Sequence, residues 1–167
     1  MHEIKSIESI QSTNDFVIKF ANVNGSGSAS ANQMFAKAMF RMGIPVSPKN
    51  IFPSNIQGLP TWFEVRVNEK GYLGSRGGVD IAVAMNPQSY SKDVDEILPG
   101  GYLLYDSTWK RNFNRKDITV IEIPLTQLCV EAFKNPKQRP VSYTHLRAHE
   151  TVLDLVCSLL LDKKKGG

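Results

Sequence analysis

A glycine- and serine-rich segment that separates a short apolar run from an amphipathic stretch constrains the fold of this chain most strongly. Residues 15–21 are β-branched and aromatic over a length that suits a strand. Residues 24–30 are small and polar, which predicts a loop. Residues 31–42 carry apolar side chains with the spacing of an amphipathic helix, and Gly43 and Pro45 then end the helix. The apolar positions of this helix are Met34, Phe35, Ala38, Met39 and Met42. Strand, glycine loop and helix in this order predict the opening of an α/β unit.

The remainder of the chain alternates strand and helix signals. Residues 62–67 alternate apolar with charged side chains, as a half-solvated strand does. Residues 79–85 form a near-continuous apolar run that suits a buried parallel strand, whereas residues 47–60 are rich in Pro, Asn and Gly and predict a loop. Further strands are expected at 102–106 and 118–123, and helices at 91–98 and 126–133. This alternation predicts an α/β fold with helices on both faces of the sheet, a three-layer α/β/α arrangement.

Composition excludes several classes of protein. With 167 residues, 41% hydrophobic side chains and a net charge of +4, the chain suits one folded domain and not a disordered segment. Two cysteines are too few for a disulfide scaffold. No apolar run approaches the ~18 residues of a membrane span, the N-terminus lacks a signal-peptide pattern, and the basic residues are scattered. We therefore expect a cytoplasmic protein with no membrane partner and no nucleic-acid partner.

The C-terminal segment contains the residues that most suggest a metal site. His145 and His149 are spaced i, i+4 and Glu150 follows them, a pattern that could hold zinc on a helix. From Val141 onward, however, the chain resembles the translation, in one reading frame, of a transposase-type sequencing-library adapter. We therefore expect residues 140–167 to be a non-native tail.

Setting this tail aside removes most metal and nucleophile chemistry from consideration. His2 and Cys129 are then the only histidine and the only cysteine in residues 1–139. A Ser-His-Asp or Cys-His mechanism has no internal histidine to use, and a His/Cys metal site lacks its ligands. We predict no catalytic residue and no metal ligand in this part of the chain.

The first candidate binding element is the loop Gly25, Ser26, Gly27, Ser28 that enters the first predicted helix. Small residues let backbone N–H groups approach an anion, and the helix N-terminus adds about half a positive charge. The loop is not a dinucleotide fingerprint, because the third glycine of that motif would fall at Ser30, and no Lys-Ser/Thr pair makes it a P-loop. Binding of a phosphate or carboxylate therefore competes with a plain strand-to-helix turn capped by Ser28 or Ser30.

A second candidate lies in the predicted loop before residues 62–67. Asn55, Gln57 and Gly58 stand between prolines, where amide side chains can present donors and acceptors from a rigid loop. The alternative is an ordinary surface loop that Trp62 fixes to the core.

A third group flanks the buried strand at residues 79–85. Arg76 could bind a carboxylate or phosphate through two hydrogen bonds, or be a solvated arginine on a turn. Asp80 is expected to accept hydrogen bonds from backbone amides at the start of the strand. Asn86 and residues 106–109 directly follow strands, where open α/β sheets bind their ligands.

Several blocks in order add a family resemblance. Residues 22–29, 52–66, 83–87 and 99–109 resemble the gamma domain of 2-oxoacid:ferredoxin oxidoreductases. More narrowly, they are similar to that domain as it opens the alpha subunit of 2-oxoglutarate-type enzymes. The resemblance covers residues 14–139, which leaves residues 1–13 as an N-terminal leader and implies the pyruvate–ferredoxin oxidoreductase gamma-domain fold.

Two departures favour the fused form of this domain. Stand-alone gamma subunits commonly have Gly-Gly-Gln-Gly where this chain has Ser28, Ala29 and Ser30 after Gly27. They commonly have Arg-Gly-Gly near residues 59–61, which here are Leu-Pro-Thr. Both differences point to an alpha-subunit fragment.

The resemblance implies a reaction and a set of partners. In this family a 2-oxoacid is decarboxylated, its acyl group passes to coenzyme A, and two electrons leave singly to ferredoxin. Thiamine diphosphate and iron–sulfur clusters serve this chemistry, and a cluster normally takes four thiolates, so neither is expected on this domain alone. The expected partners are the missing remainder of the alpha subunit, a beta subunit carrying thiamine diphosphate, and ferredoxin.

Within such a complex the resemblance implies that this domain covers the active site and helps form the coenzyme A region. The loop at residues 25–30 is then the natural contact for phosphate or pantetheine, and the fragment alone is expected to be inactive. The alternative is a free-standing α/β module that binds a nucleotide or an acyl carrier without catalysis. A nicotinamide dehydrogenase is disfavoured by the missing third glycine.

Overall fold

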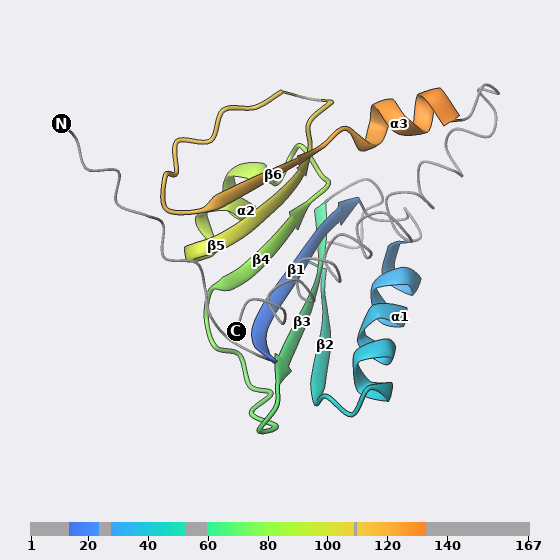
Figure 1. The fold of residues 1–167 in the computed structure, drawn as a ribbon, viewed down its shortest axis with the longest axis vertical. Coiled ribbons are helices and arrows are strands. Elements are labelled where there is room, and N and C mark those ends of the chain that lie inside the picture. The colour runs from blue at the N-terminus through green and yellow to red at the C-terminus, as the bar shows by residue number, and fades with distance from the viewer. Residues whose placement is uncertain (1–13, 24–27, 53–59, 109, 133–167) are drawn as a thin grey trace, which may run out of the picture.

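Six strands form one mixed sheet in which only one strand runs against the others (Figure 1). The computed structural model describes residues 14–23, 28–52, 60–108 and 110–132. The strands, in chain order, are β1 (Asp15–Val23), β2 (Val46–Ile51), β3 (Pro60–Asn68), β4 (Val79–Ala84), β5 (Ile97–Asp106) and β6 (Thr119–Ile123). Their order in the sheet is β2-β3-β1-β4-β5-β6, and β3 pairs antiparallel with both of its neighbours while the other pairs are parallel.

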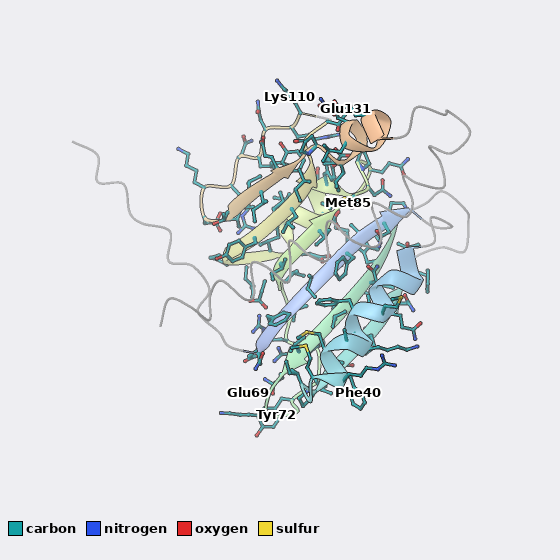
Figure 2. The ribbon with its side chains drawn as sticks, turned by 45° about the vertical axis from the view of Figure 1, so that its right-hand side comes forward. Phe40, Glu69, Tyr72, Met85, Lys110 and Glu131 are labelled. Atoms are coloured by element: carbon teal, nitrogen blue, oxygen red, sulfur yellow. The ribbon has the colours of Figure 1, made fainter. Side chains whose placement is uncertain are left out.

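The strands of this sheet begin and end along two opposite sides. On one side β1, β4, β5 and β6 end and β3 begins, and we call this row of strand ends the carboxyl edge, as distinct from an edge strand. Met85 lies toward this edge, while Glu69 and Tyr72 lie at the opposite end of the strands (Figure 2). In open α/β sheets, ligands bind outside the carboxyl ends of the strands, so the carboxyl edge is where the site is expected.

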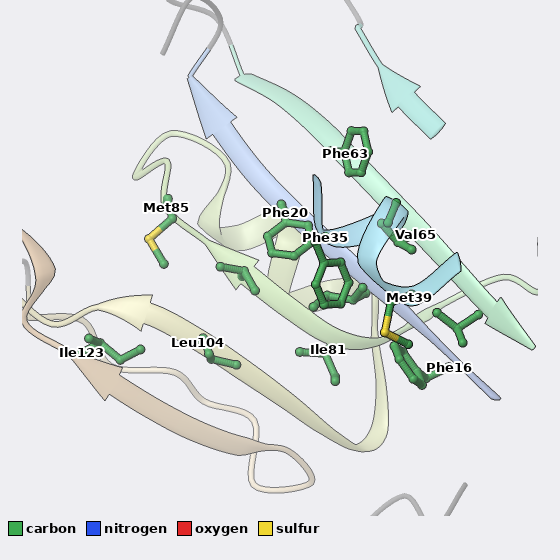
Figure 3. Packing of buried hydrophobic residues seen from close by; sticks show 14 of the residues in the cluster. Phe16, Phe20, Phe35, Met39, Phe63, Val65, Ile81, Met85, Leu104 and Ile123 are labelled. Carbon is green, nitrogen blue, oxygen red and sulfur yellow. The ribbon is translucent and has the colours of Figure 1, made fainter. Parts of the chain in front are cut away.

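The helices lie on opposite faces of the sheet, which confirms the predicted three layers (Figure 1). Phe35 and Met39 of α1 (Ser28–Arg41) belong to the core on one face, with Phe20 and Phe63 of the sheet (Figure 3). In the second core, Tyr90 and Val94 of α2 (Tyr90–Asp95) pack against sheet residues such as Leu103. A third helix, α3 (Leu125–Ala132), follows β6.

Alternation along β1 explains why this strand is buried on both sides. Phe16, Ile18 and Phe20 face α1, while Val17 belongs to the core under α2. Phe20 pairs with Phe63 of β3 and meets the ring of Phe35 edge-on at 5.9 Å between centroids. A central strand covered by both helix layers needs apolar residues at consecutive positions, as the sequence of β1 has.

The segment between β5 and β6 covers the same face of the sheet as α2. The Phe113 ring packs edge-on against Tyr105 and Tyr90, at 4.9 and 6.4 Å between centroids. Arg115 Nη1 donates hydrogen bonds to the carbonyl oxygens of Val94 (2.9 Å) and Ile97 (2.7 Å). These contacts close the second core without a regular crossover helix.

The prediction of a loop over residues 47–60 is wrong at its beginning. Residues Val46–Ile51 form β2, which pairs antiparallel with β3. The strand tolerates Pro48, which has no N–H to donate, because among the described strands β2 lies at the edge of the sheet and pairs only with β3. Proline and asparagine therefore mark an edge strand here and not a break.

The boundary between α2 and β5 also differs from the prediction. The helix expected at residues 91–98 ends at Asp95, and β5 begins at Ile97, before the predicted strand start at residue 102. Gly101 lies inside β5 where a Cβ would come within 2.8 Å of the Asp80 carbonyl oxygen and 2.6 Å of the Ile97 side chain. Gly101 therefore permits a close approach of β4 and β5.

The buried face of α1 is rotated from the expected one. Phe35 and Met39 are buried as predicted, but Met34, Ala38 and Met42 are exposed. Asn32 and Ala36 are also buried, among the residues of α1 whose side chains are described. Apolar residues stand on two adjoining faces of this helix, so their spacing alone did not distinguish the inner face from the outer one.

The strand predicted at residues 62–67 is present but is not half-solvated. Arg66 is only 6% exposed, and its guanidinium pairs with Asp15 at 2.5 Å and donates to the carbonyl oxygens of Val67 (2.6 Å) and Phe16 (3.3 Å). The charge at this position is satisfied internally, which a period-two pattern cannot reveal.

Candidate functional site

The sheet register brings together the strand residues to which the two predicted binding loops are attached. Val23 at the end of β1 pairs with Pro60 at the start of β3. The glycine loop leaves β1 after Val23, and the segment with Asn55, Gln57 and Gly58 enters β3 at Pro60. The two loops are therefore attached side by side at the carboxyl edge.

Of the nine predicted binding residues, six lie outside the described residues and a seventh is described only in its backbone. Those outside are Gly25, Ser26, Gly27, Asn55, Gln57 and Gly58. The backbone of Ser28 begins α1, three residues earlier than the predicted helix start. No acidic residue stands in the first turn of α1, so nothing there opposes an anion at the helix N-terminus.

Asn86 ties the end of β4 to the end of β1. Its side chain is 2% exposed, its Oδ1 accepts a hydrogen bond from Gln88 N (3.0 Å), and its Nδ2 donates to the carbonyl oxygen of Asn22 (3.4 Å). The neighbouring Met85 N donates to Ala21 O at 3.1 Å. Asn86 therefore lies at the predicted edge, and its described contacts shape the loop after β4 and the exit of β1.

A buried carboxylate that the sequence analysis missed lies beside this loop. Asp93 in α2 is 3% exposed and accepts two hydrogen bonds of 2.6 Å, one from Trp62 Nε1 and one from Ser89 Oγ. Burial raises the pKa of Asp93, and the hydrogen bonds from Ser89 and Trp62 and the charge of Lys19 act in the opposite direction. The expectation that Trp62 fixes the segment before it to the core is consistent with its burial and this hydrogen bond.

Two ammonium groups flank the Trp62 ring. Lys92 Nζ lies 4.4 Å and Lys19 Nζ 5.3 Å from the ring centroid, and Lys19 also forms an ion pair with Glu96. A cation over the face of an indole is attracted by the ring electrons. The position of Trp62 is therefore set by one hydrogen bond and two cations as well as by apolar packing.

The end of β5 holds the start of α3. Asp106 is fully buried, and its carboxylate accepts hydrogen bonds from Thr108 N (3.1 Å), from Thr126 N (3.2 Å) and from the Thr126 hydroxyl. Thr108 Oγ1 in turn accepts from Gln127 N at 3.1 Å. A carboxylate at a helix N-terminus is favoured by the helix dipole, so this strand end positions α3.

Arg76 lies at the opposite end of the strands from Asn86. It precedes β4 and pairs with Asp80, and its Nη1 lies 3.8 Å from Asp15 Oδ1 at the start of β1. Asp80 Oδ2 accepts a 2.7 Å hydrogen bond from Val17 N, so this aspartate does bind a backbone amide, but the amide belongs to the neighbouring strand β1 and not to the start of its own strand. The structure does not bring Arg76 together with Asn86 or with the ends of the glycine loop.

The described part of the chain offers no candidate metal site. Within these ranges no group of three or more His, Cys, Asp or Glu side chains could hold a metal ion. Among the helices of the described part, none is long and apolar enough to cross a membrane.

Comparison with known proteins yields one family. The model of the family described as pyruvate ferredoxin/flavodoxin oxidoreductase matches residues 17–149. The alpha subunit of 2-oxoacid:ferredoxin oxidoreductase 2 from Aeropyrum pernix is 28% identical over 92 residues, which cover 55% of this chain and 14% of that subunit. The chain thus spans a small part of the length of this relative.

Solved structures share the fold. The 2-oxoglutarate:ferredoxin oxidoreductase from Magnetococcus marinus, whose structure holds 2-oxoglutarate, coenzyme A and succinyl-CoA, aligns with a TM-score of 0.65 at 21% identity, over 92% of this chain and 31% of that one. The keto/oxoacid ferredoxin oxidoreductase gamma subunit from Geobacter sulfurreducens aligns with a TM-score of 0.60 at 16% identity, over 77% of this chain and 70% of that one. For the PORC subunit of pyruvate oxidoreductase from Thermotoga maritima the TM-score is 0.51 at 17% identity, over 81% and 94%. With a family match over most of its length, this chain belongs to the pyruvate ferredoxin/flavodoxin oxidoreductase family.

Proposed function

We propose that this chain is the gamma domain at the start of the alpha subunit of a 2-oxoacid:ferredoxin oxidoreductase, and that its carboxyl edge helps form the coenzyme A region. The observation that carries the proposal is the pairing of Val23 with Pro60, which attaches the glycine loop and the segment 53–59 side by side. The hydrogen bond from Asn86 Nδ2 to Asn22 O holds the loop after β4 against the same edge.

The chemistry of this edge suits an anionic acyl carrier. The N–H groups in the first turn of α1 have no intrahelical acceptors, and this end of the helix favours negative charge. Coenzyme A carries both phosphates and a pantetheine arm with amide groups, so it offers partners to helix N–H groups and to amide side chains. The bound coenzyme A and succinyl-CoA of the Magnetococcus marinus enzyme support this choice of ligand.

In this proposal the domain helps bind coenzyme A and covers the active site, and other parts of the complex carry out the reaction. The 2-oxoacid loses its carboxylate as CO2, the acyl group forms a bond to the coenzyme A sulfur, and two electrons pass singly to ferredoxin. The 167-residue chain has two cysteines, whereas an iron–sulfur cluster normally takes four thiolates. Thiamine diphosphate and the clusters are therefore assigned to the rest of the alpha subunit and to a beta subunit.

We also propose the 2-oxoglutarate-type, fused form of this domain, acting in the cytoplasm. The residues after Gly27 and those at 59–61 depart from the pattern of stand-alone gamma subunits, and the relative from Aeropyrum pernix is an alpha subunit.

A charge placed in the glycine loop tests the proposal. In the intact complex, Gly27→Asp is expected to raise the KM for coenzyme A about tenfold, because a carboxylate repels phosphates at the helix N-terminus. Gly74→Asp is the matched control, since Gly74 precedes Arg76 at the opposite edge and a Cβ there meets nothing within 4 Å. An unchanged KM for coenzyme A in the Gly27→Asp complex would overturn the proposal.

The proposed boundaries are tested on the gene. We propose residues 1–13 as a leader, 14–139 as the gamma domain and 140–167 as a tail of adapter origin. Resequencing the gene from genomic DNA is expected to show a frame that continues past Arg139 into a thiamine-type domain. A native codon sequence for His145 to Glu150 would contradict the adapter origin, and a stop codon near Arg139 would favour a free-standing binding module.

A further inference from the structure

One buried carboxylate is bonded to both segments that meet β1 at the carboxyl edge. Asp93 Oδ1 accepts from Trp62 Nε1 and Asp93 Oδ2 accepts from Ser89 Oγ, each at 2.6 Å. All three residues are at least nine-tenths buried. The hydrogen bond to Trp62 connects α2, which follows β4 in the chain, to β3, which β1 separates from β4 in the sheet.

Trp62 fixes the entry of the chain into β3. It is the third residue of that strand and pairs with Ala21 of β1. The segment with Asn55, Gln57 and Gly58 ends directly before Pro60. A hydrogen bond that holds Trp62 therefore also sets where this segment joins the sheet.

Ser89 fixes the loop that follows β4. Its backbone N donates to Asn86 O at 3.1 Å, and the same carbonyl oxygen lies 3.2 Å from Ser89 Oγ. The Asn86 side chain then reaches Asn22 O, near the residue where β1 leads into the glycine loop. A continuous chain of hydrogen bonds thus runs from Trp62 through Asp93, Ser89 and Asn86 to the end of β1.

A carboxylate has a specific use at this position. It can accept both hydrogen bonds at once, whereas an asparagine offers one acceptor oxygen and an apolar side chain offers none. Burying the charge is costly; the positive charge of Lys19 offsets only part of this cost, and the negative charge of Glu96 adds to it. Apolar residues would hold α2 on the sheet without that cost, so packing alone does not account for Asp93.

We propose that Asp93 is a positioning residue for coenzyme A binding, because its carboxylate holds the start of β3 and the loop after β4 in one arrangement against the end of β1. This inference rests on the proposed function of the carboxyl edge. It assigns to Asp93 no contact with the ligand, since the aspartate acts through Trp62, Ser89 and Asn86.

Steady-state kinetics of the intact complex test the inference. Asp93→Asn and Trp62→Phe are each expected to raise the KM for coenzyme A about tenfold, with kcat and the KM for the 2-oxoacid changed by less than about twofold. The effect of the double variant is expected to fall short of the product of the single effects, because both substitutions act on the contact between Trp62 and Asp93. Asp117→Asn is the control, as that carboxylate is partly exposed and pairs with Arg115 away from the carboxyl edge.

The outcomes separate this inference from the proposed function. If Gly27→Asp raises the KM for coenzyme A and neither Asp93→Asn nor Trp62→Phe does, the positioning role is wrong and the proposed function stands. Multiplicative effects in the double variant, or equal increases in the KM values of both substrates, would also overturn the positioning role. If Gly27→Asp leaves the KM for coenzyme A unchanged, the proposed function itself fails.

Discussion

Trp62 Nε1 donates a 2.6 Å hydrogen bond to Asp93 Oδ1 and so joins β3 to α2 across the intervening strand β1. The sheet makes room for this contact with small residues. Trp62 pairs with Ala21, and Ala21 pairs with Ala84, so two methyl side chains follow the indole in one row across the sheet. A larger side chain at either alanine would occupy the space between the indole and α2. The hydrogen bond therefore depends on residues from three strands as well as on its two partners.

Replacing Asp93 by Asn should change how stability depends on pH. Because burial raises the pKa of Asp93, the folded state binds its proton more tightly than the unfolded state does. The contribution of this group to the free energy of unfolding is therefore greatest below the unfolded value of 3.8 and falls as pH rises toward the folded pKa. Urea denaturation can be measured at a series of pH values that starts at about 4, near the ordinary pKa of aspartate. Asp93→Asn is expected to gain stability relative to wild type as the pH increases.

Asp15 provides a control of opposite sign. The hydrogen bond from Arg66 lowers the pKa of Asp15, so its contribution to stability is present above 3.8 and is lost as pH falls through the lower folded pKa. With the pH series extended below 3.8, Asp15→Asn should therefore lose stability relative to wild type as pH rises toward that value, by a small amount because the Asp15 side chain is 41% exposed. The same trend in both variants would show that the Asp93 pKa is not raised.

Replacing Asn32 by Leu should stabilise the fold. Asn32 is 3% exposed on the inner face of α1, and its Nδ2 has no hydrogen-bond partner among the described residues. Removing a buried unpaired donor is expected to increase the free energy of unfolding by about 1–3 kcal/mol, measured by urea denaturation. Gln33→Leu on the exposed face is the control and should change stability by less than about 0.5 kcal/mol. A large loss of stability in Asn32→Leu would mean that the Asn32 amide does bond in the folded protein.

Removing the Asp106 carboxylate should release the start of α3. Asp106→Ala leaves the N–H groups of Thr108 and Thr126 without their acceptor, at a cost of about 2–3 kcal/mol in the free energy of unfolding. Hydrogen exchange should accelerate most at Thr126 and Gln127. Thr108→Val removes only the acceptor of Gln127 N and is expected to cost about 1 kcal/mol, so equal losses would argue against the central role of Asp106.

Adding a methyl group at Gly101 should force β4 and β5 apart. The new Cβ would lie 2.8 Å from the Asp80 carbonyl oxygen, which is backbone and cannot easily move. Gly101→Ala is expected to lower the free energy of unfolding by about 1–3 kcal/mol. Gly74→Ala is the matched control, because nothing lies within 4 Å of its Cβ position and stability should change by about 0.5 kcal/mol or less.

Local patterns predicted the central strands and both helix layers. The apolar run at residues 79–85 became the buried parallel strand β4, and the strand, glycine loop and helix at the start became β1 and α1. The same patterns missed β2, because an edge strand can hold Pro48 and needs little apolar character. They also mistook the inner face of α1, since apolar residues stand on two of its faces.

The order of residues along the chain was enough to indicate which segments flank the ends of strands, because turn residues and apolar runs act locally. It did not determine which of those segments meet. Only the sheet order, with β3 antiparallel beside β1, brings residues 23 and 60 together. The same order places Arg76 at the end of the strands opposite to the carboxyl edge. The hydrogen bond between Trp62 and Asp93, 31 positions apart, likewise has no sequence signature. Such a contact depends on the distance between two elements after packing, and packing is a property of the whole fold.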